Sequence, residues 1–467
     1  MEESKKNTRR SFIKQNAVVG AGLAMGSGLS PVLFNTAKKA NSGAIPALLG
    51  GRSLFNTANP PHWPEWPLWI PQTDEAQVLN VLRSGVWSRA KVVDQFEAAF
   101  ADILGAKKCV TTVNGTNALI CALVNLNIGG GDEVIVPPYT FIATVQAILQ
   151  VGAMPVFVDI NPETFQIDAD KIEEKITNRT RAILPVHIAG LPADMVRIMK
   201  IAHKHNLVVV EDACQAHLAE INHQKVGTFG HAGCFSFQNS KNLPIGEGGA
   251  IVSNDASFVD KCYSYHNYGI AHGSVIDDMG KGIVMLGTKL RLTEYQAAIG
   301  LAQLKRLEEQ TEKRNKNAKY LKSQIELIAG IIPYKLTPGV TRAAYHLFPF
   351  RYKKEYFKGL TRSAFLKALR AEGVPCSAGY DTLNDKPYLK NAFQTKNFRK
   401  LYEKRQLDWN LFLERNKCPE NDLICKEEAV WFTQNMLLGT RIDMDYIALA
   451  IQKVYKHSED LVKNTTA

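Results

Sequence analysis

The chain of 467 residues predicts an α/β fold built on a mainly parallel sheet. Two patterns lead to this expectation. From about residue 75 to 306, short apolar segments alternate with amphipathic ones, which is typical of repeated strand–helix units. Within them, residues 207–215 form a β-branched run that ends in Glu211 and Asp212, as in a parallel strand covered on both faces. The length suffices for one large domain and a smaller one.

The predicted strands of the large domain follow one another between helical segments. They cover residues 109–113, 133–136, 155–158, 182–186, 208–211, 233–237 and 250–253. A long amphipathic helix, from about 293 to 325, leads out of this domain, which we place at 75–325. Residues 326–467 are expected to form a small α+β domain that ends in a helix at 443–457.

Residues 51–74 are predicted to form an irregular arm. Prolines at positions 60, 61, 64, 67 and 71 alternate with Trp63, Trp66 and Trp69, and prolines at this density exclude a helix. The tryptophans either pack the arm onto the body or reach a partner subunit, and we favour packing.

Residues 1–50 are interpreted as an export leader. Arg9 and Arg10 precede Phe12 and Lys14 in an arrangement that resembles the twin-arginine signal. The weakly apolar run that follows, 17–34, is short and rich in Gly for a stable membrane span. We therefore expect export by the twin-arginine route, and whether the leader is cleaved or persists as an anchor stays open. The alternative is a basic leader on a cytoplasmic protein.

The net charge of +11 does not indicate a nucleic-acid partner. Almost half of the excess lies in the first fifty residues, where seven Lys or Arg stand against two Glu. The rest is spread over helices and a basic stretch at 386–405, without a recognisable binding module, so solvated faces are the favoured interpretation.

The eight cysteines show no CxxC or Cys/His spacing, so no metal site is expected. Most lie in apolar segments and are interpreted as small core residues. Whether Cys418 and Cys425 pair in an oxidising compartment stays open at this point.

Lys241 is the first candidate for chemistry. It lies between a short apolar strand and the Gly-rich turn 246–249, where backbone can approach a ligand closely. An amine in such a place can form a Schiff base with a carbonyl, although most lysines are simply surface residues.

Asp212 favours the chemical interpretation of Lys241. Ligands bind at the carboxyl ends of strands in open α/β sheets, and Asp212 ends such a strand. A lysine and a carboxylate are the pair that pyridoxal 5′-phosphate (PLP) requires: the lysine carries the aldehyde as an imine, and the acid keeps the pyridine nitrogen protonated.

Residues 114–118 begin a predicted helix directly after a strand. Free backbone N–H groups and the helix dipole favour a phosphate there, although an ordinary helix cap would leave the same pattern.

At these residues the chain resembles the DegT/DnrJ/EryC1/StrS family of sugar aminotransferases, from about Trp87 to the last helix. The matching stretches are 113–119, 131–144, 185–187, 211–216, 235–237 with Lys241, 246–249 and 291–300. Residues 371–380 are more similar to the cyclitol and aminohydroxybenzoate branch than to the nucleotide-sugar branch. The resemblance implies the type I, aspartate-aminotransferase-like fold of PLP-dependent transferases and a homodimer with shared active sites.

The same resemblance assigns roles to further residues. Gly115 and Thr116 belong to the phosphate cup, and Ser236 matches a serine that hydrogen-bonds the phosphate. Phe141 matches an aromatic residue that stacks on the cofactor ring, and Gln215 matches a contact to the ring's 3-oxygen. His187 matches a position on the substrate side of the ring, although a buried structural histidine fits the sequence equally well.

The chain departs from the family pattern at Lys289. Relatives often have Gly-x-Asn-x-Arg there, with an asparagine that reaches the phosphate in the neighbouring subunit. Residues 287–291 place Lys289 at that position, and a lysine can still bind phosphate as a point charge.

The sequence therefore predicts a PLP-dependent aminotransferase that moves an amino group from glutamate or glutamine to a keto-sugar or ketocyclitol through Lys241. Two alternatives are a sugar dehydratase relative, in which histidine replaces the lysine, and a catalytically silent PLP-binding sensor or structural protein. Lys241 argues against the first alternative, and the presence of both Lys241 and Asp212 argues against the second.

Overall fold

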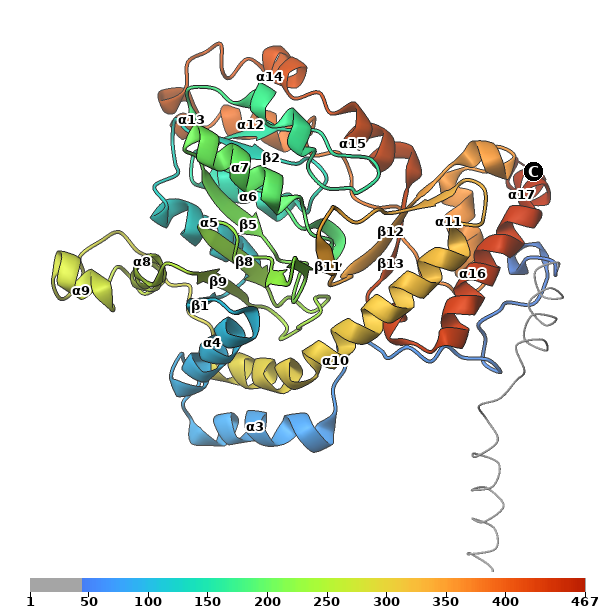
Figure 1. Ribbon diagram of the computed structural model, residues 1–467, viewed down its shortest axis with the longest axis horizontal. Coiled ribbons are helices and arrows are strands. Elements are labelled where there is room, and N and C mark those ends of the chain that lie inside the picture. The colour runs from blue at the N-terminus through green and yellow to red at the C-terminus, as the bar shows by residue number, and fades with distance from the viewer. Residues whose placement is uncertain (1–43, 467) are drawn as a thin grey trace, which may run out of the picture.

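The computed structural model describes residues 44–466, so nearly all of the predicted leader lies outside the described residues. Within them, a seven-stranded sheet has the order β1-β9-β8-β5-β4-β2-β3 (Figure 1). The strands are β1 (Lys108–Thr112), β2 (Glu133–Val136), β3 (Met154–Phe157), β4 (Thr180–Ile183), β5 (Val208–Asp212), β8 (Ala232–Ser236) and β9 (Gly249–Ser253).

Most neighbouring strands of this sheet run parallel, which confirms the predicted sheet. The exception is β9, which pairs antiparallel with both β1 and β8. The other four pairs, from β8 to β3, are parallel. Each strand predicted from the sequence overlaps one of the observed strands.

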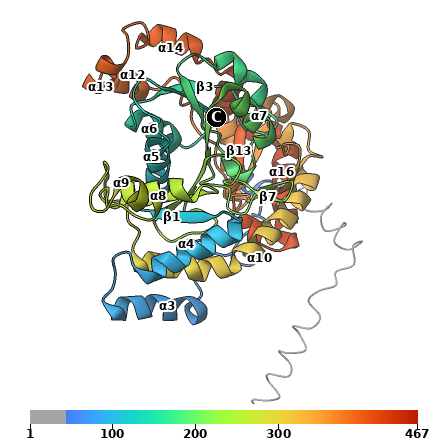
Figure 2. The same cartoon turned by 60° about the vertical axis from the view of Figure 1, so that its left-hand side comes forward.

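Helices cover both faces of the sheet because successive strand residues point to opposite faces. In β2, Val134 and Val136 join the core under α5 (Gly115–Asn125), α6 (Ile142–Gln150) and α8 (Ala256–His266). Ile135 joins the opposite core, under α4 (Lys91–Leu104), α7 (Met195–His205) and the long α10 (Glu294–Ile325). Figure 2 shows α8 and α4 on the two sides of β1.

The helix α10 matches the one predicted at 293–325 and carries the chain to a second, antiparallel sheet. That sheet consists of β10 (Ile331–Pro333), β12 (Leu347–Tyr352) and β13 (Ala429–Thr433). The helices α11 (Arg362–Ala371) and α16 (Arg441–Lys456) pack beside it. The predicted last helix corresponds to α16, but α17 (Ser458–Thr466) follows it and buries Leu461.

The chain between β12 and β13 returns to the edge of the large sheet. It forms α12 (Pro387–Phe393), α13 (Lys396–Leu401), α14 (Trp409–Arg415) and α15 (Pro419–Leu423), at the top of Figure 1. The Tyr402 hydroxyl donates to the Gly152 carbonyl at 2.8 Å, and the Asn416 side chain accepts from the Phe157 N–H at 2.7 Å. This segment therefore covers edge strand β3, which is one way to protect a sheet edge.

A third, small sheet joins the two halves of the chain. It pairs β6 (Glu220–Ile221) with β7 (Gln224–Lys225) and with β11 (Val340–Arg342).

The Pro- and Trp-rich arm packs onto the body, as expected. The Trp66 indole donates to the Lys241 carbonyl at 3.0 Å, and the Trp63 ring lies edge-on to Phe55. The predicted irregular arm ends earlier than expected, because residues 71–74 form the first turn of α3 (Pro71–Ser84), where a proline is tolerated. The helix α3 lies along α10 and is joined to it by a salt bridge between Asp74 and Arg306.

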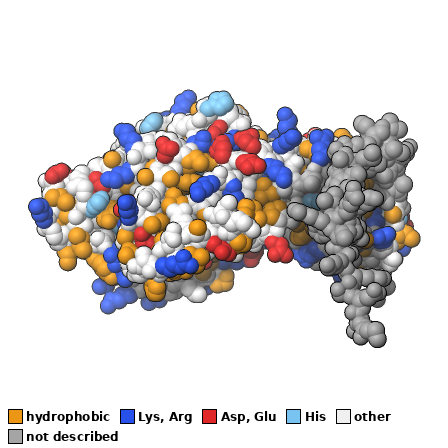
Figure 3. Space-filling model, turned by 90° about the horizontal axis from the view of Figure 1, so that it is seen from below, with side chains coloured by type: hydrophobic (Ala, Val, Ile, Leu, Met, Phe, Trp, Pro, Cys, Tyr) orange, Lys and Arg blue, Asp and Glu red, His pale blue; other side chains and the backbone are white. Residues whose placement is uncertain are grey.

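Acidic and basic side chains are interspersed on the face of the molecule seen from below (Figure 3). Within residues 44–466, no helix is long and apolar enough to cross a membrane. All eight cysteines are free thiols, and Cys418 and Cys425 are both buried.

Candidate active site

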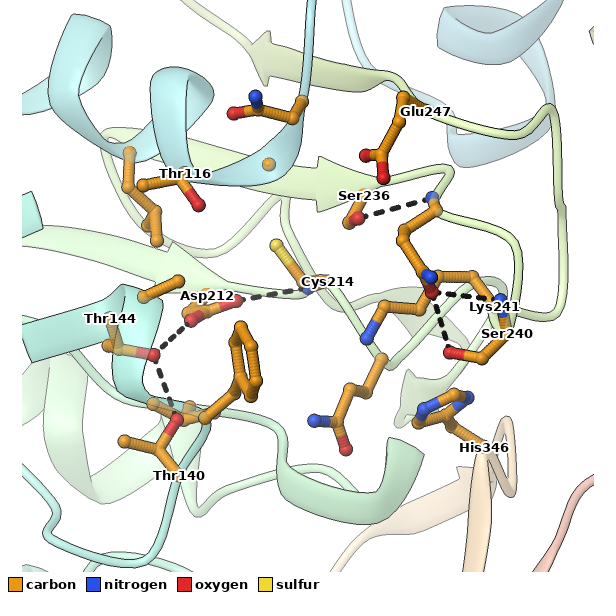
Figure 4. A pocket seen from close by; sticks show the side chains of 18 of the residues that line it. Thr116, Thr140, Thr144, Asp212, Cys214, Ser236, Ser240, Lys241, Glu247 and His346 are labelled. Atoms are coloured by element: carbon orange, nitrogen blue, oxygen red, sulfur yellow. Dashed lines mark hydrogen bonds between the residues drawn. The ribbon is translucent and has the colours of Figure 1, made fainter. Parts of the chain in front are cut away.

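A cavity of about 520 Å³ lies at the carboxyl ends of β5 and β8 (Figure 4). Seven residues proposed from the sequence line it: Gly115, Thr116, Phe141, Asp212, Gln215, Ser236 and Lys241. These residues come from five separate segments of the chain, so the fold brings together what the sequence only suggested.

The Asp212 carboxylate is fixed by hydrogen bonds on both oxygens. Its Oδ2 accepts from the Thr144 hydroxyl at 2.7 Å, and its Oδ1 accepts from the Cys214 N–H at 3.1 Å. The Thr144 hydroxyl also pairs with that of Thr140. Because Asp212 is only 5% exposed, a carboxylate held in this way can serve as a preorganised partner for a buried cation or N–H group.

The N-terminus of α5 is pressed against the end of β8. A Cβ atom on Gly115 would lie 2.8 Å from both the Cys214 sulfur and the Ser236 Cβ, so a larger residue does not fit. Asn114 caps the helix by accepting from the Asn117 N–H at 2.9 Å. The first N–H groups of a helix have no partner within it, and with the Thr116 and Ser236 hydroxyls they form a cradle for an anion.

Phe141 is a large apolar residue that is 56% exposed, although it sits at the start of a buried helix. It lines the cavity together with Thr140, Thr144 and Asp212. An aromatic face left open toward a cavity suits a flat ring ligand.

Lys241 reaches into the cavity from the loop after β8 (Figure 4). Burial lowers the pKa of its ammonium group, and the nearby Cys214 and Asp212 oppose this shift. The lowered pKa increases the fraction of neutral amine, which is the form that acts as a base or nucleophile.

The opposite wall of the cavity comes from the second half of the chain. The Gln215 amide donates to the Tyr380 hydroxyl at 2.7 Å and accepts from the Ala189 N–H at 2.8 Å. His346 also lines the cavity, and its buried Nδ1 finds no hydrogen-bond partner among residues 44–466. Burial and the nearby Lys241 charge hold the pKa of His346 well below its usual value, so the ring is neutral.

The structure places two predicted residues elsewhere. His187 is fully buried and does not line the cavity. Its Nδ1 accepts from the Ala193 N–H, and its Nε2 therefore donates to Glu211 at 3.0 Å, so the structural interpretation of this histidine applies. Lys289 is exposed and lies outside the cavity of its own chain.

Several cavity residues were not proposed from the sequence: Thr140, Thr144, Cys214, Gln238, Ser240, Glu247, His346 and Tyr380. Thr144 had a signal, because it follows Phe141 by three residues on a predicted helix and so shares its face. No signal pointed to His346, and Tyr380 was indicated only as part of the similar stretch 371–380. Both lie more than 100 residues from Lys241 in sequence and reach the cavity only through the tertiary fold.

Residues 70–404 match the model of the DegT/DnrJ/EryC1/StrS aminotransferase family. The chain belongs to this family. It is accordingly a PLP-dependent aminotransferase, as Lys241 and Asp212 predicted.

Similar proteins place the chain within the family. The L-glutamine:scyllo-inosose aminotransferase of Streptomyces griseus is 34% identical over 431 residues, which cover 87% of this chain and 97% of the relative. The spore coat polysaccharide biosynthesis protein SpsC of Bacillus subtilis is 35% identical over 334 residues, covering 70% and 85%. The crystal structure of 3-amino-5-hydroxybenzoic acid synthase matches with a TM-score of 0.72 and 30% identity, over 86% of this chain and 99% of that one. The predicted fold is thereby confirmed.

The cavity residues fit PLP. The close approach at Gly115 leaves an anion cradle at one end, Phe141 offers an open aromatic face, and Asp212 presents a fixed carboxylate. Lys241 is the amine within reach of the same space. The chemistry of this set matches a phosphate, a flat ring, a protonated ring nitrogen and an aldehyde.

Asp212→Asn is expected to leave the cofactor bound but to slow its reaction with an amino donor by roughly two orders of magnitude or more, the scale on which a positioned acid–base group acts. The amide is as large as the carboxylate but lacks the charge that keeps a proton on the ring nitrogen. Cofactor absorbance measures binding, and single-turnover kinetics with L-glutamine measure the rate. Asp194→Asn, a helix-cap change on α7, is the control; equal rates in the two variants would make Asp212 a structural residue.

Proposed function

We propose that this aminotransferase transfers the amino group of L-glutamine to the ketone of a polyhydroxylated ring, a ketocyclitol, with a keto-sugar as the second candidate acceptor. The observation that carries the proposal is the Lys241–Asp212 pair in one cavity, together with similarity to an L-glutamine:scyllo-inosose aminotransferase over 87% of the chain. The similarity to a polysaccharide biosynthesis protein supports the second candidate.

Different side chains of the cavity would bind the cofactor and transfer the proton. When bound, PLP supplies an electron sink that acidifies the carbon next to the amino nitrogen. Gly115, Thr116 and Ser236 would hold its phosphate, and Lys241 would hold its aldehyde carbon. Once the amino group of the donor has displaced Lys241 from that carbon, its freed neutral amine would remove a proton from one carbon and return it to another, as general base and acid.

Asp212 would keep the ring nitrogen of PLP protonated during this proton transfer. Since its two oxygens are already oriented by Thr144 and Cys214, the carboxylate needs no rearrangement when charge develops near it. Tyr380 and His346 bring polar groups to the far wall, where the ring hydroxyls of an acceptor would lie.

The acceptor class can be tested by loading the purified protein with PLP and L-glutamine and offering scyllo-inosose or a nucleotide-linked keto-sugar. We expect amination of the inosose at a rate at least about tenfold higher, because a missing or misplaced hydrogen-bonded hydroxyl costs at least that factor. Chromatography detects the aminated product, and Lys241→Ala serves as the inactive control. Amination of the nucleotide-linked substrate alone would overturn the ketocyclitol proposal in favour of the second candidate.

We also propose that the enzyme is a homodimer in which each chain completes the other's phosphate site. Among the described residues that line the cavity, Lys241 is the only lysine or arginine, and Glu247 adds a negative charge. A phosphate dianion there lacks a cation other than the catalytic amine. A cation supplied by a second copy would satisfy this need.

Lys289 is suited to supply that cation. It is exposed and lies in the segment 267–291, which includes α9 (Ser274–Met279) and projects from the body (Figure 1). In the same segment Ile283 and Leu286 are 76% and 80% exposed, as expected of a surface that a partner covers.

Subunit mixing tests this arrangement. A Lys241→Ala subunit paired with a Lys289→Ala subunit would form one site with both lesions and one with neither, so activity should rise above that of either parent. Subunits with different tags verify the exchange. In the control mixture, Lys281→Ala is used instead of Lys289→Ala, because Lys281 is an exposed lysine of the same segment. Mixed dimers that form but regain no activity would rule out the cross-subunit role.

We further propose that the protein leaves the cytoplasm by the twin-arginine route. The support is Arg9 and Arg10 before Phe12 and Lys14, followed by a weakly apolar run. This route carries folded proteins, so PLP could be inserted before export. Nucleotide sugars are made in the cytoplasm, and export would therefore favour an acceptor that is not nucleotide-linked.

Replacing Arg9 and Arg10 by lysine should keep the enzyme active but retain it in the cytoplasm. Cell fractionation with an activity assay on each fraction measures both properties. An unaltered protein found in the cytoplasm would contradict export and would return nucleotide-linked sugars as favoured substrates.

A further inference from the structure

The backbone of Lys241 is held from outside the sheet by the N-terminal arm. The Trp66 indole N–H donates to the Lys241 carbonyl at 3.0 Å, across 175 residues of sequence. On the other side, the Lys241 N–H donates to the Gln238 carbonyl at 2.8 Å, which closes a turn whose residues Asn239 and Ser240 are exposed. The indole thus contacts the backbone of Lys241, the only lysine among the described residues that line the cavity.

Hydrogen bonds fix the backbone of the arm before and after Trp66. The Pro64 carbonyl accepts from the Asn435 side chain at 3.0 Å. The Leu68 carbonyl accepts from Gln303 at 2.9 Å and from Arg306 at 3.1 Å. Because the carbonyls two residues before and two residues after Trp66 are both fixed, the position of the indole is set by the turn after β13 and by α10 together.

The ring of Trp66 has a second contact, with Arg314. The Arg314 guanidinium lies 5.4 Å from the ring centroid, a distance at which a cation and an aromatic face attract each other. Arg314 is fully buried, and two of its N–H groups donate to Gln434 at 2.9 and 2.6 Å.

Arg314 has no carboxylate within salt-bridge distance in the part of the chain that the structure describes, and its NH1 atom lacks a hydrogen-bond partner there. Burial lowers the pKa of Arg314 to about 9. The aromatic ring is therefore one of the few groups that offset this buried charge, and the contact restrains the orientation of the indole.

We propose that Trp66 is a positioning residue for the catalytic lysine. The amine of Lys241 has to carry a proton between two carbon atoms, which requires its side chain to move while its backbone stays in place. A hydrogen bond to the Lys241 carbonyl confines the motion to the side chain and keeps the amine buried. This inference rests on the role of Lys241 in the proposed function, not on the identity of the acceptor.

Trp66→Phe isolates the hydrogen bond, because phenylalanine keeps an aromatic ring beside Arg314 but lacks the N–H donor. Trp63→Phe is the matched control: Trp63 belongs to the same arm, but its ring contact is with Phe55. Circular dichroism and thermal unfolding establish that both variants fold. The donor half-reaction with L-glutamine and competitive acetylation of Lys241 in cofactor-free protein are then compared.

We expect Trp66→Phe to lower the rate constant of the donor half-reaction roughly 10- to 100-fold, as a small misplacement of a reacting group does, with little change in donor binding. Since burial lowers the pKa of Lys241, a looser turn should expose the amine and raise that pKa toward its ordinary value, which acetylation against pH detects. Trp63→Phe should change neither quantity. If the two variants give equal rates and equal acetylation profiles, the positioning role is wrong.

A second variant keeps the test decisive if Trp66→Phe does not fold. Asn435→Ala leaves the indole in the chain but frees the Pro64 carbonyl, and it should shift both readouts in the same direction by a smaller amount. No shift in either readout would likewise overturn the proposal. The acetylation measurement uses no substrate, so a wrong acceptor class cannot be mistaken for a failure of this inference.

Discussion

The parallel pairing of β5 with β8 is the constraint on which the site depends. Their register sets Asp212 opposite Cys234, so that Asp212 and Ser236 end two neighbouring strands at the same edge of the sheet. A slip of one residue would turn Asp212 to the other face of the sheet. Lys241 follows β8 by five residues and can reach the same cavity only while that register holds.

Close backbone packing at α5 adds the anion cradle to this pair. Gly115 approaches Cys214 and Ser236 so closely that no side chain fits, and Gly249 of β9 approaches the Asn114 backbone in the same way. The antiparallel strand β9 is therefore part of the site, although it contributes no catalytic group. It brings the helix N-terminus to a distance at which its N–H groups and the Ser236 hydroxyl serve one ligand.

The region behind Lys241 has an unusual electrostatic character. Arg314 is buried without a counter-ion among the described residues, and two histidines nearby, His217 and His346, are buried in their neutral form. Burial, with the charge of Lys241 second, lowers the pKa of His217 to about 3. A region that disfavours added positive charge also favours the neutral amine of Lys241, which its chemistry needs.

The family resemblance assigned Gly115 and Phe141, whereas the sequence by itself determined the strands, the helix α10, the α/β fold class and the residues Lys241 and Asp212. These are local signals: apolar periodicity, a strand that ends in an acid, and a turn rich in glycine report on the short stretch that contains them. Only the tertiary structure decided that Tyr380 and His346 complete the cavity, that His187 serves the core, and that Trp66 holds Lys241. The contacts of Tyr380, His346 and Trp66 join segments more than 100 residues apart. They depend on how the sheet, α10 and the arm pack. For His187 the sequence allowed both roles, because the hydrogen bond to Glu211 exists only once β4 and β5 are paired.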